Sequence, residues 1–326
     1  MLKSIMVVLI VIVVLCGASC DTIKLTDECY LSSIGHESFM GTSSIQAAGE
    51  DIYHISNGGI SRHKKGVNKC EIIIDDSTFY IFVSDNNIYH AYDDKIFKTN
   101  LDGQNKIMVW DESKLANYSG DWMGLGAFVV YQDILYIWNT GTSIIKYVPG
   151  TEVVVDFIDD VSSFAFVGEY VYYVEHAERT FSIFEKSLNS GEIKLVRGEG
   201  TIFEVDDRRD NMIDRVIVVG DKLFYSKRFY PAIYEFNAHG KDVVIADFPE
   251  IFEIEFMHMF SIGNKLYYKI NENGFGKLFV YDLQIQEITL LAESEELTQV
   301  RAFVIHNDSL FYDDGELKRI RIKMLG

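Results

Sequence analysis

The sequence has few positively charged residues for its length. It contains 30 Lys and Arg against 49 Asp and Glu, which gives a formal net charge of −19 at pH 7. Nucleic acids carry a phosphate on every nucleotide, and proteins that bind them need a basic surface. The charge balance therefore argues against a nucleic-acid partner. It favours solubility and attraction to cations or basic partners.

Sequence signatures of common catalytic, nucleotide and metal sites are also missing. There is no Gly-x-Ser-x-Gly, His-Glu-x-x-His, phosphate loop or Asp-x-Asp-x-Asp-Gly calcium loop. The eight histidines are scattered without metal-ligand spacing, so we expect no metal and no cofactor. Single histidines are more often structural than functional. His258 alone is kept as a candidate site residue, because the apolar run 256–260 predicts an inner strand beside a central channel.

Helix signals are weak as well. Only three prolines occur, and no stretch of 10–15 residues shows helical amphipathicity. Hydrophobic residues make up 48% of the chain, with 19 Tyr and 22 Phe, so a large core can be buried. Aromatic residues favour half-buried pleated surfaces. These features predict an all-β protein that is nearly free of helix.

An apolar run stands at the N-terminus. Lys3 precedes the unbroken apolar segment 5–15, and small residues follow. A membrane-spanning helix needs about 20 apolar residues, whereas a secretory signal has a shorter core of this kind. We assign residues 1–20 to a signal peptide and expect export. An uncleaved anchor is the alternative.

The end of this segment resembles a lipobox, the cleavage site of bacterial lipoproteins. It reads Gly17-Ala18-Ser19-Cys20, with Gly17 where leucine is usual. Cleavage before Cys20 leaves three cysteines, and lipidation of Cys20 leaves Cys29 and Cys70 as an even pair. They are candidates for a disulfide in an oxidising compartment, with two free thiols as the alternative. We therefore expect a membrane-anchored lipoprotein that faces the exterior or periplasm, or otherwise a fully secreted protein.

A short pattern, a polar turn followed by an apolar residue and tyrosine, recurs along the rest of the chain. Its last aromatic residues stand at positions 53, 89, 136, 173, 225, 268 and 312, which are 36 to 52 residues apart. One four-stranded propeller blade takes roughly 40 to 50 residues. The seven copies are Gly49–Tyr53, Asp85–Tyr89, Gln132–Tyr136, Gly168–Tyr173, Gly220–Tyr225, Gly263–Tyr268 and Asn307–Tyr312.

Each copy lies within a set of further predicted strands. Apolar runs such as 79–83 and 127–131 precede the turn and suit buried inner strands. A second strand and an outer strand follow, as in 95–103 and 106–110. The repeat predicts a single β-propeller of about seven four-stranded blades over residues 44–326, with six or eight as alternatives.

The second copy carries a family resemblance. Its segment, Tyr89-His90-Ala91-Tyr92-Asp93-Asp94-Lys95-Ile96 through Leu101-Asp102-Gly103, resembles the repeat of bacterial propellers similar to the YWTD domains of the low-density-lipoprotein receptor. The resemblance covers about residues 45–322 and is fullest in this copy. It implies a propeller fold within a family of mostly unknown function.

The last copy ends too near the C-terminus to supply an outer strand. An open ring leaves unpaired strand edges, which invite aggregation. The lead segment 21–43 contains the short alternating stretch 22–25, so we expect an N-terminal strand there to close the ring on the last blade.

The links between outer and inner strands hold the candidate binding residues. These links are rich in Asp and Glu, which either attract cations or basic peptides or are simply solvated. The link 111–125 contains Tyr118 and Trp122, which suit recognition of sugar rings or peptide side chains, or else form a hydrophobic loop tucked against a blade edge. The link 196–214 carries a mixed-charge run that suits a polar ligand or local ion pairing: Asp206, Asp207, Arg208 and Arg209.

Three functions remain open from the sequence. The first is an exported, membrane-tethered, monomeric module that binds a protein, peptide or glycan, attached to the membrane only through a lipid at Cys20. The second is an envelope enzyme, a lyase or hydrolase, with carboxylates assembled from several blades at the channel. The third is a structural envelope protein without a ligand.

Overall fold

The structure, a computed structural model, describes most of the chain from residue 45 to residue 321. The described residues are 45–56, 59–65, 67, 70–84, 86–116, 118, 120, 122, 124–139, 143–151, 153–177, 180–198, 213–219, 222–227, 232–237, 242–247, 258–262, 264–300, 302–306, 309–313 and 317–321.

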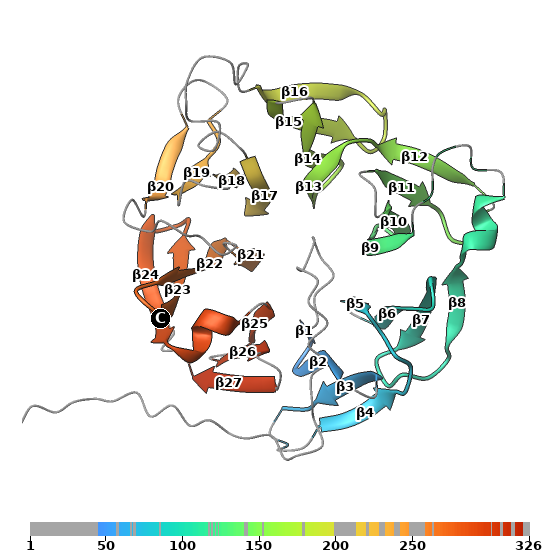
Figure 1. Cartoon of the computed structure of the whole chain (residues 1–326), viewed down its shortest axis with the longest axis horizontal. Helices are drawn as coiled ribbons and strands as arrows, with labels where there is room; N and C mark the ends of the chain where they lie inside the picture. Colours follow the sequence, from blue (N-terminus) through green and yellow to red (C-terminus); the bar gives the residue numbers. More distant parts are fainter. Residues whose placement is uncertain are drawn as a thin grey trace, which may run out of the picture.

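Antiparallel sheets stand side by side around a ring (Figure 1). Each sheet is formed by strands that follow one another in the chain, from the innermost to the outermost. The first four sheets are β1 (Ile45–Ala48), β2 (Asp51–Ser56), β3 (Gly59–His63) and β4 (Cys70–Ile74); β5 (Tyr80–Val83), β6 (Asn87–Tyr92), β7 (Lys95–Asn100) and β8 (Ile107–Trp110); β9 (Leu125–Tyr131), β10 (Ile134–Asn139), β11 (Ile144–Tyr147) and β12 (Val154–Ile158); and β13 (Val161–Val167), β14 (Tyr170–Ala177), β15 (Thr180–Ser187) and β16 (Ile193–Gly198).

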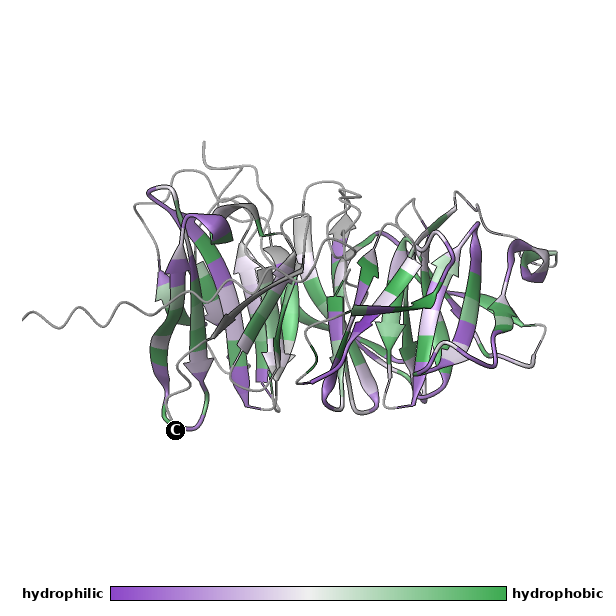
Figure 2. Cartoon of the chain, turned by 90° about the horizontal axis from the view of Figure 1, so that it is seen from below, coloured by the Kyte–Doolittle hydropathy of each residue, from purple (hydrophilic) through white to green (hydrophobic). Residues whose placement is uncertain are grey.

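Three more sheets complete the ring, and the last has three strands in the described part of the chain. They are β17 (Ile213–Val219), β18 (Lys222–Lys227), β19 (Ala232–Glu235) and β20 (Val243–Asp247); β21 (His258–Ile262), β22 (Lys265–Glu272), β23 (Phe275–Asp282) and β24 (Glu287–Ser294); and β25 (Ala302–His306), β26 (Ser309–Asp313) and β27 (Leu317–Arg321). Two short 3-10 helices, η1 (Glu112–Leu115) and η2 (Glu296–Gln299), lie in links between sheets. Seen from the side, the ring is flat, with turns and links at its two faces (Figure 2).

The predicted all-β propeller is confirmed. Six sheets have the predicted four strands, and β25–β27 form a three-stranded seventh. Within the described residues the only helical segments are η1 and η2, as a sequence poor in helix signals predicts. The signal segment 1–20 and the predicted closing strand at 22–25 lie outside the described residues and stay predictions.

Side chains of each second strand alternate between the two neighbouring sheets, because successive residues of a strand point to opposite faces. On β10, Leu135 and Ile137 pack with the sheet β5–β8, and Tyr136 packs with the sheet β13–β16. The aromatic residues that match Tyr136 also face the following sheet. They are Tyr53, Tyr89, Tyr172, Phe224, Tyr267 and Phe311.

Alignment on the last aromatic of each repeat is therefore wrong in four copies. Tyr173, Tyr225, Tyr268 and Tyr312 pack against the preceding sheet instead. In these copies two aromatic residues stand together, and the first of them matches Tyr53. A shift of one residue moves a side chain to the opposite face, so the last aromatic of these copies is not the structural equivalent of Tyr53.

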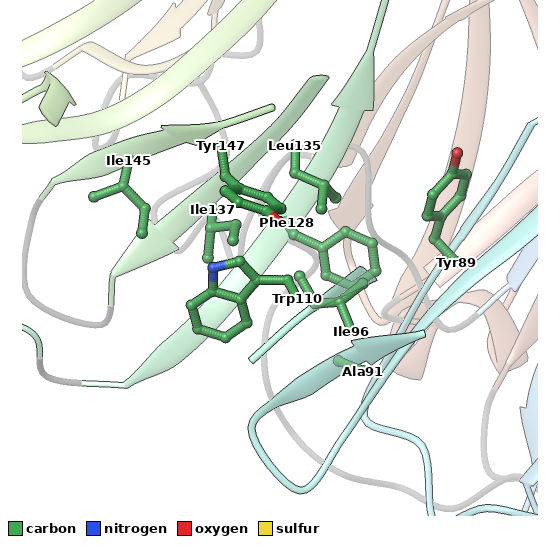
Figure 3. Close-up of a cluster of buried hydrophobic side chains, with 9 residues drawn as sticks. All are labelled: Tyr89, Ala91, Ile96, Trp110, Phe128, Leu135, Ile137, Ile145 and Tyr147. Atoms are coloured by element: carbon green, nitrogen blue, oxygen red, sulfur yellow. The ribbon is translucent and has the colours of Figure 1, made fainter. Parts of the chain in front are cut away.

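Clusters of buried apolar side chains fill the spaces between neighbouring sheets. Figure 3 shows the one between β5–β8 and β9–β12, where Trp110 lies among Ile96, Phe128 and Ile137. The last cluster joins Phe311 of β26 to Ile45 and Ile52 of the first sheet. The ring is thus closed by packing between its first and last sheets.

Polar side chains join the innermost strands of neighbouring sheets. Each of these strands is the first of its sheet, so one of its hydrogen-bonding edges faces no other strand of that sheet. The Gln46 amide of β1 donates to the Ile81 carbonyl at 3.0 Å and accepts from the Val83 amide at 2.6 Å, both on β5. The Ser163 hydroxyl of β13 accepts from the Val216 amide of β17 at 3.0 Å. These bonds satisfy backbone groups that would otherwise be unpaired.

The Leu-Asp-Gly turn of the second sheet holds that sheet against the first. Asp102 accepts a hydrogen bond from the buried guanidinium of Arg62 at 2.6 Å, and Arg62 also pairs with Glu71 at 3.0 Å. Gly103 has a φ of +73°, and a Cβ there would lie 2.0 Å from the Ile73 carbonyl oxygen of β4. The turn therefore needs glycine both for its backbone conformation and for the close approach.

The outer strands of the six four-stranded sheets expose apolar side chains at the rim, which we call the apolar belt. Exposed apolar residues lie there on strands whose outer edges have no partner in their own sheet. The belt consists of Ile72, Ile107, Met108, Val155, Ile193, Leu195, Val243, Val244, Ile288 and Leu290.

Replacement of Gly103 by alanine should destabilise the protein strongly. Gly191 is a matched control, because its φ of +74° is nearly the same and no heavy atom lies within 4 Å of its added Cβ. Both variants carry the backbone strain, but only Gly103→Ala adds overlap, so we expect it to lose about 2 kcal/mol more than Gly191→Ala. Urea unfolding measures both. Equal losses of unfolding free energy in the two variants would show that the close approach of Gly103 to β4 adds no cost.

Candidate binding face

The candidate residues named from the sequence fall in three places. Tyr118 and Trp122 lie in the link between β8 and β9. His258 is the first residue of the inner strand β21, as its sequence context predicts, but its side chain lies outside the described residues. The run Asp206, Asp207, Arg208 and Arg209, and the cysteines Cys20 and Cys29, also lie outside. Cys70 begins β4 and packs in the cluster between the first and last sheets.

The link from β8 to β9 begins with the short helix η1. The Asp111 carboxylate caps it by accepting a hydrogen bond from the Ser113 amide at 2.9 Å. Aspartate at this position satisfies an amide that the helix itself cannot pair. Leu115, near the end of η1, packs on the cluster of Figure 3. The link is thus fixed at its start on the edge of the sheet.

Trp122 lies against the protein core. Its ring is 5.2 Å from that of the fully buried Trp110, with the two planes inclined at 51°. Its indole nitrogen donates to the Glu112 carboxylate at 2.9 Å. Packing and polar satisfaction together hold the ring in place, which is the arrangement expected of a hydrophobic loop tucked against a blade edge.

Tyr118 joins the same link to the next sheet. Its hydroxyl donates to the Asp156 carboxylate of β12, 38 residues further along the chain. Burial raises the pKa of Tyr118, and the charges of Asp156 and Asp159 add to this effect. The hydroxyl therefore stays protonated and acts as a donor. A Cβ at Gly120 would overlap the Tyr118 ring, so glycine there gives the ring room.

Acidic side chains surround these two aromatic rings. Glu112, Asp156 and Asp159 are all solvent-exposed. Glu112 and Asp156 each accept one hydrogen bond from the rings and keep lone pairs facing water. The result is a half-buried aromatic floor with carboxylates at its margin.

Other described links and turns at this end of the inner strands are acidic too. Some of their carboxylates have cationic partners, such as Asp76 with Lys106 and Asp93 with Lys95. Among the described residues, Asp75, Asp94 and Glu295 are exposed and have no ion-pair partner. We call the surface formed by these links and turns the link face. It carries unbalanced negative charge.

Two carboxyl groups with shifted pKa values lie away from this cluster. Hydrogen bonds to Arg62 and Lys64 lower the pKa of Glu71, and a backbone hydrogen bond from Gln284 lowers that of Asp282. A catalytic pair of carboxylates would instead show a raised pKa in one member. In the described part of the chain, no group of three or more His, Cys, Asp or Glu is arranged to hold a metal ion, and no helix is long and apolar enough to span a membrane.

Comparison with known proteins identifies the fold but no family. No family model and no curated protein matches the sequence. Similar solved structures include streptogramin B lyase, with 11% identity, 93% of this chain and 97% of that chain covered, and a TM-score of 0.59. The N-terminal domain of Nup159 is also similar, with 10% identity, 86% of this chain and 89% of that chain covered, and a TM-score of 0.53.

A third similar structure is PorZ, a bacterial surface component of the type-IX secretion system of Porphyromonas gingivalis. The identity is 11%, and the TM-score is 0.57. The match covers 89% of this chain but 37% of PorZ. At these identities the likeness shows a β-propeller fold alone.

Replacement of Trp122 by alanine should lower the free energy of unfolding by about 2 kcal/mol, because the ring packs on Trp110. Trp122→Phe keeps an aromatic ring and should recover most of this loss. Thermal or urea unfolding of both variants measures it. A Trp122→Ala variant as stable as the parent would instead favour a ring held outward for ligand recognition.

Proposed function

We propose that this protein is an exported binding module that takes a basic peptide segment of a partner protein on its link face. The observation that carries the proposal is a set of exposed carboxylates, Asp75, Asp94 and Glu295, that have no cationic partner among the described residues, in a chain of net charge −19. Such a surface attracts lysine and arginine side chains and speeds their association.

The geometry around Tyr118 and Trp122 favours a peptide over a glycan. Sugar rings stack on exposed aromatic faces, but both rings here are half-buried and bonded to carboxylates. The outward groups are the carboxylates of Glu112, Asp156 and Asp159. Carboxylates form charge-assisted hydrogen bonds with guanidinium and ammonium groups.

The repeated architecture supports a binding role as well. The described links join sheets that each pack against their neighbours, so the link face is a rigid support for several recognition segments. The resemblance to YWTD-type repeats is fullest in the second copy of the repeat. We therefore keep it as part of this proposal. The enzyme and purely structural alternatives have no described residue that favours them.

Binding should follow the charge of the link face. We expect a Lys/Arg-rich peptide to bind with a Kd that rises at least about fivefold between roughly 50 and 200 mM salt, because salt screens exposed charges. The triple variant Asp75→Asn, Asp94→Asn, Glu295→Gln should weaken binding. The matched control is Asp133→Asn, Glu169→Gln, Glu192→Gln, which removes the same charge from turns on the opposite face.

Isothermal titration of the peptide into each protein measures these effects, with a Gln-substituted peptide of the same length as the ligand control. Equal weakening by the two triple variants would mean that net charge alone attracts the peptide. Absence of binding at low salt would remove the proposal.

We propose that export ends in attachment to a membrane through lipidated Cys20. Expression of the full chain in a bacterium should give a mature product that begins at Cys20 and carries diacylglycerol. Cys20→Ser should remove the adduct and release the protein from the membrane fraction. Intact-mass analysis decides this, and an unmodified mature chain would contradict it.

A further inference from the structure

The contact between the first and last sheets, which we call the seam, is the least apolar contact in the described ring. Its cluster has three buried hydrophobic side chains, Ile45, Ile52 and Phe311. The clusters on either side of the sheet β9–β12 have nine each. Burial of apolar area is the main stabilising term between packed sheets, and among the described side chains the seam has fewer fully buried apolar residues than those contacts.

Polar side chains take the place of apolar ones on the first sheet's side of the seam. His54 is opposite Ser61 in the strand pair β2–β3, and His63 is opposite Ile52. Alternation therefore places both histidines on the face that carries Ile52, toward the last sheet. The His63 ring lies 5.9 Å from that of Phe311, which confirms its direction.

The side chain of His54 is buried without a hydrogen bond to any described residue. Its exposure is 0%, and neither ring nitrogen has a hydrogen-bond partner among the described residues. The nearby hydroxyls of Ser56 and Ser61 bond to each other at 2.9 Å. Buried polar groups are almost always paired, so an unpaired imidazole in a packed contact needs an explanation.

The described surroundings of His54 offer no negative charge that would stabilise an imidazolium. From β3 the titratable neighbour is His63, and from β4 it is the Cys70 thiol. From β1, β25 and β26 the described neighbours in the cluster are the apolar residues Ile45, Val304 and Phe311. Burial, with a smaller contribution from His63, lowers the pKa of His54 to about 3.

We propose that the seam is an acid-sensitive contact, at which protonation of His54 separates the first and last sheets while the other sheets stay packed. The closed seam binds a proton poorly, whereas His54 in an opened seam has its ordinary affinity. Lowering the pH below about 6.5 therefore favours the opened seam, by roughly tenfold for each pH unit until the closed form also protonates.

The second sheet offers a matched position. His90 of β6 occupies the same place in its repeat as His54, is fully buried, and has a pKa of about 4 that burial lowers. It differs in its surroundings, because it stacks on Phe97 at 5.5 Å. Its sheet meets the first one through six buried apolar side chains. We do not expect that contact to open locally.

Hydrogen exchange of the full chain, read by mass spectrometry and corrected for intrinsic rates, tests the proposal. Between about pH 7.5 and about pH 5.5, peptides from β1–β2 and β26–β27 should lose roughly tenfold more protection than peptides from β9–β11. The lower pH stays above the isoelectric point of about 4.8. His54→Ile, which places the residue of the third repeat at this position, should abolish the difference, and His90→Ile should keep it.

His54→Tyr, the residue type of the last four repeats, replaces His54→Ile if that variant does not fold. The exchange difference in the wild-type chain needs no variant at all. Equal acid responses of seam and β9–β11 peptides would overturn the proposal, as would a difference that persists in either His54 variant. Because the test uses no ligand, its outcome is separate from that of the proposed peptide binding.

Discussion

The two-sided packing of each second strand is the constraint on which the rest of the molecule depends. A residue such as Ile137 fills the space toward the preceding sheet, and its neighbour Tyr136 fills the space toward the following one. Every sheet therefore packs against both of its neighbours. The contact of Phe311 with Ile45 and Ile52 extends the same rule from the last sheet back to the first, so no end of the series lacks a neighbour.

Much of this architecture was readable from the sequence, because turn chemistry and period-two alternation are local signals. They gave the all-β class, the propeller and the blade length. The sequence did not predict which neighbouring sheet each aromatic side chain faces, because Tyr172 and Tyr173 both fit the pattern and differ by one residue in register. The acidic character of the links was also readable. The hydrogen bond from Tyr118 to Asp156 was not, because it joins a link residue to a strand residue 38 positions further along the chain.

Polar groups in this ring have two contrasting roles. The Gln46 amide and the Ser163 hydroxyl take up inner-strand amides that have no strand partner, so they strengthen contacts between sheets. Arg62 does the same near the rim, with Asp102 and Glu71. His54 occupies a comparable contact without any such partner among the described residues. Hydrogen-bond satisfaction thus distinguishes the polar residues that hold the sheets together from His54, on which the proposed opening of the seam depends.

The apolar belt gives the net charge a second role. Aliphatic side chains on unpaired outer edges are suitable for edge-to-edge stacking of one ring on the rim of another. With a charge of −19, approaching rings repel before their rims meet. Colloidal stability of this protein should therefore be lowest near its isoelectric point of about 4.8, where the repulsion vanishes and the belt stays apolar.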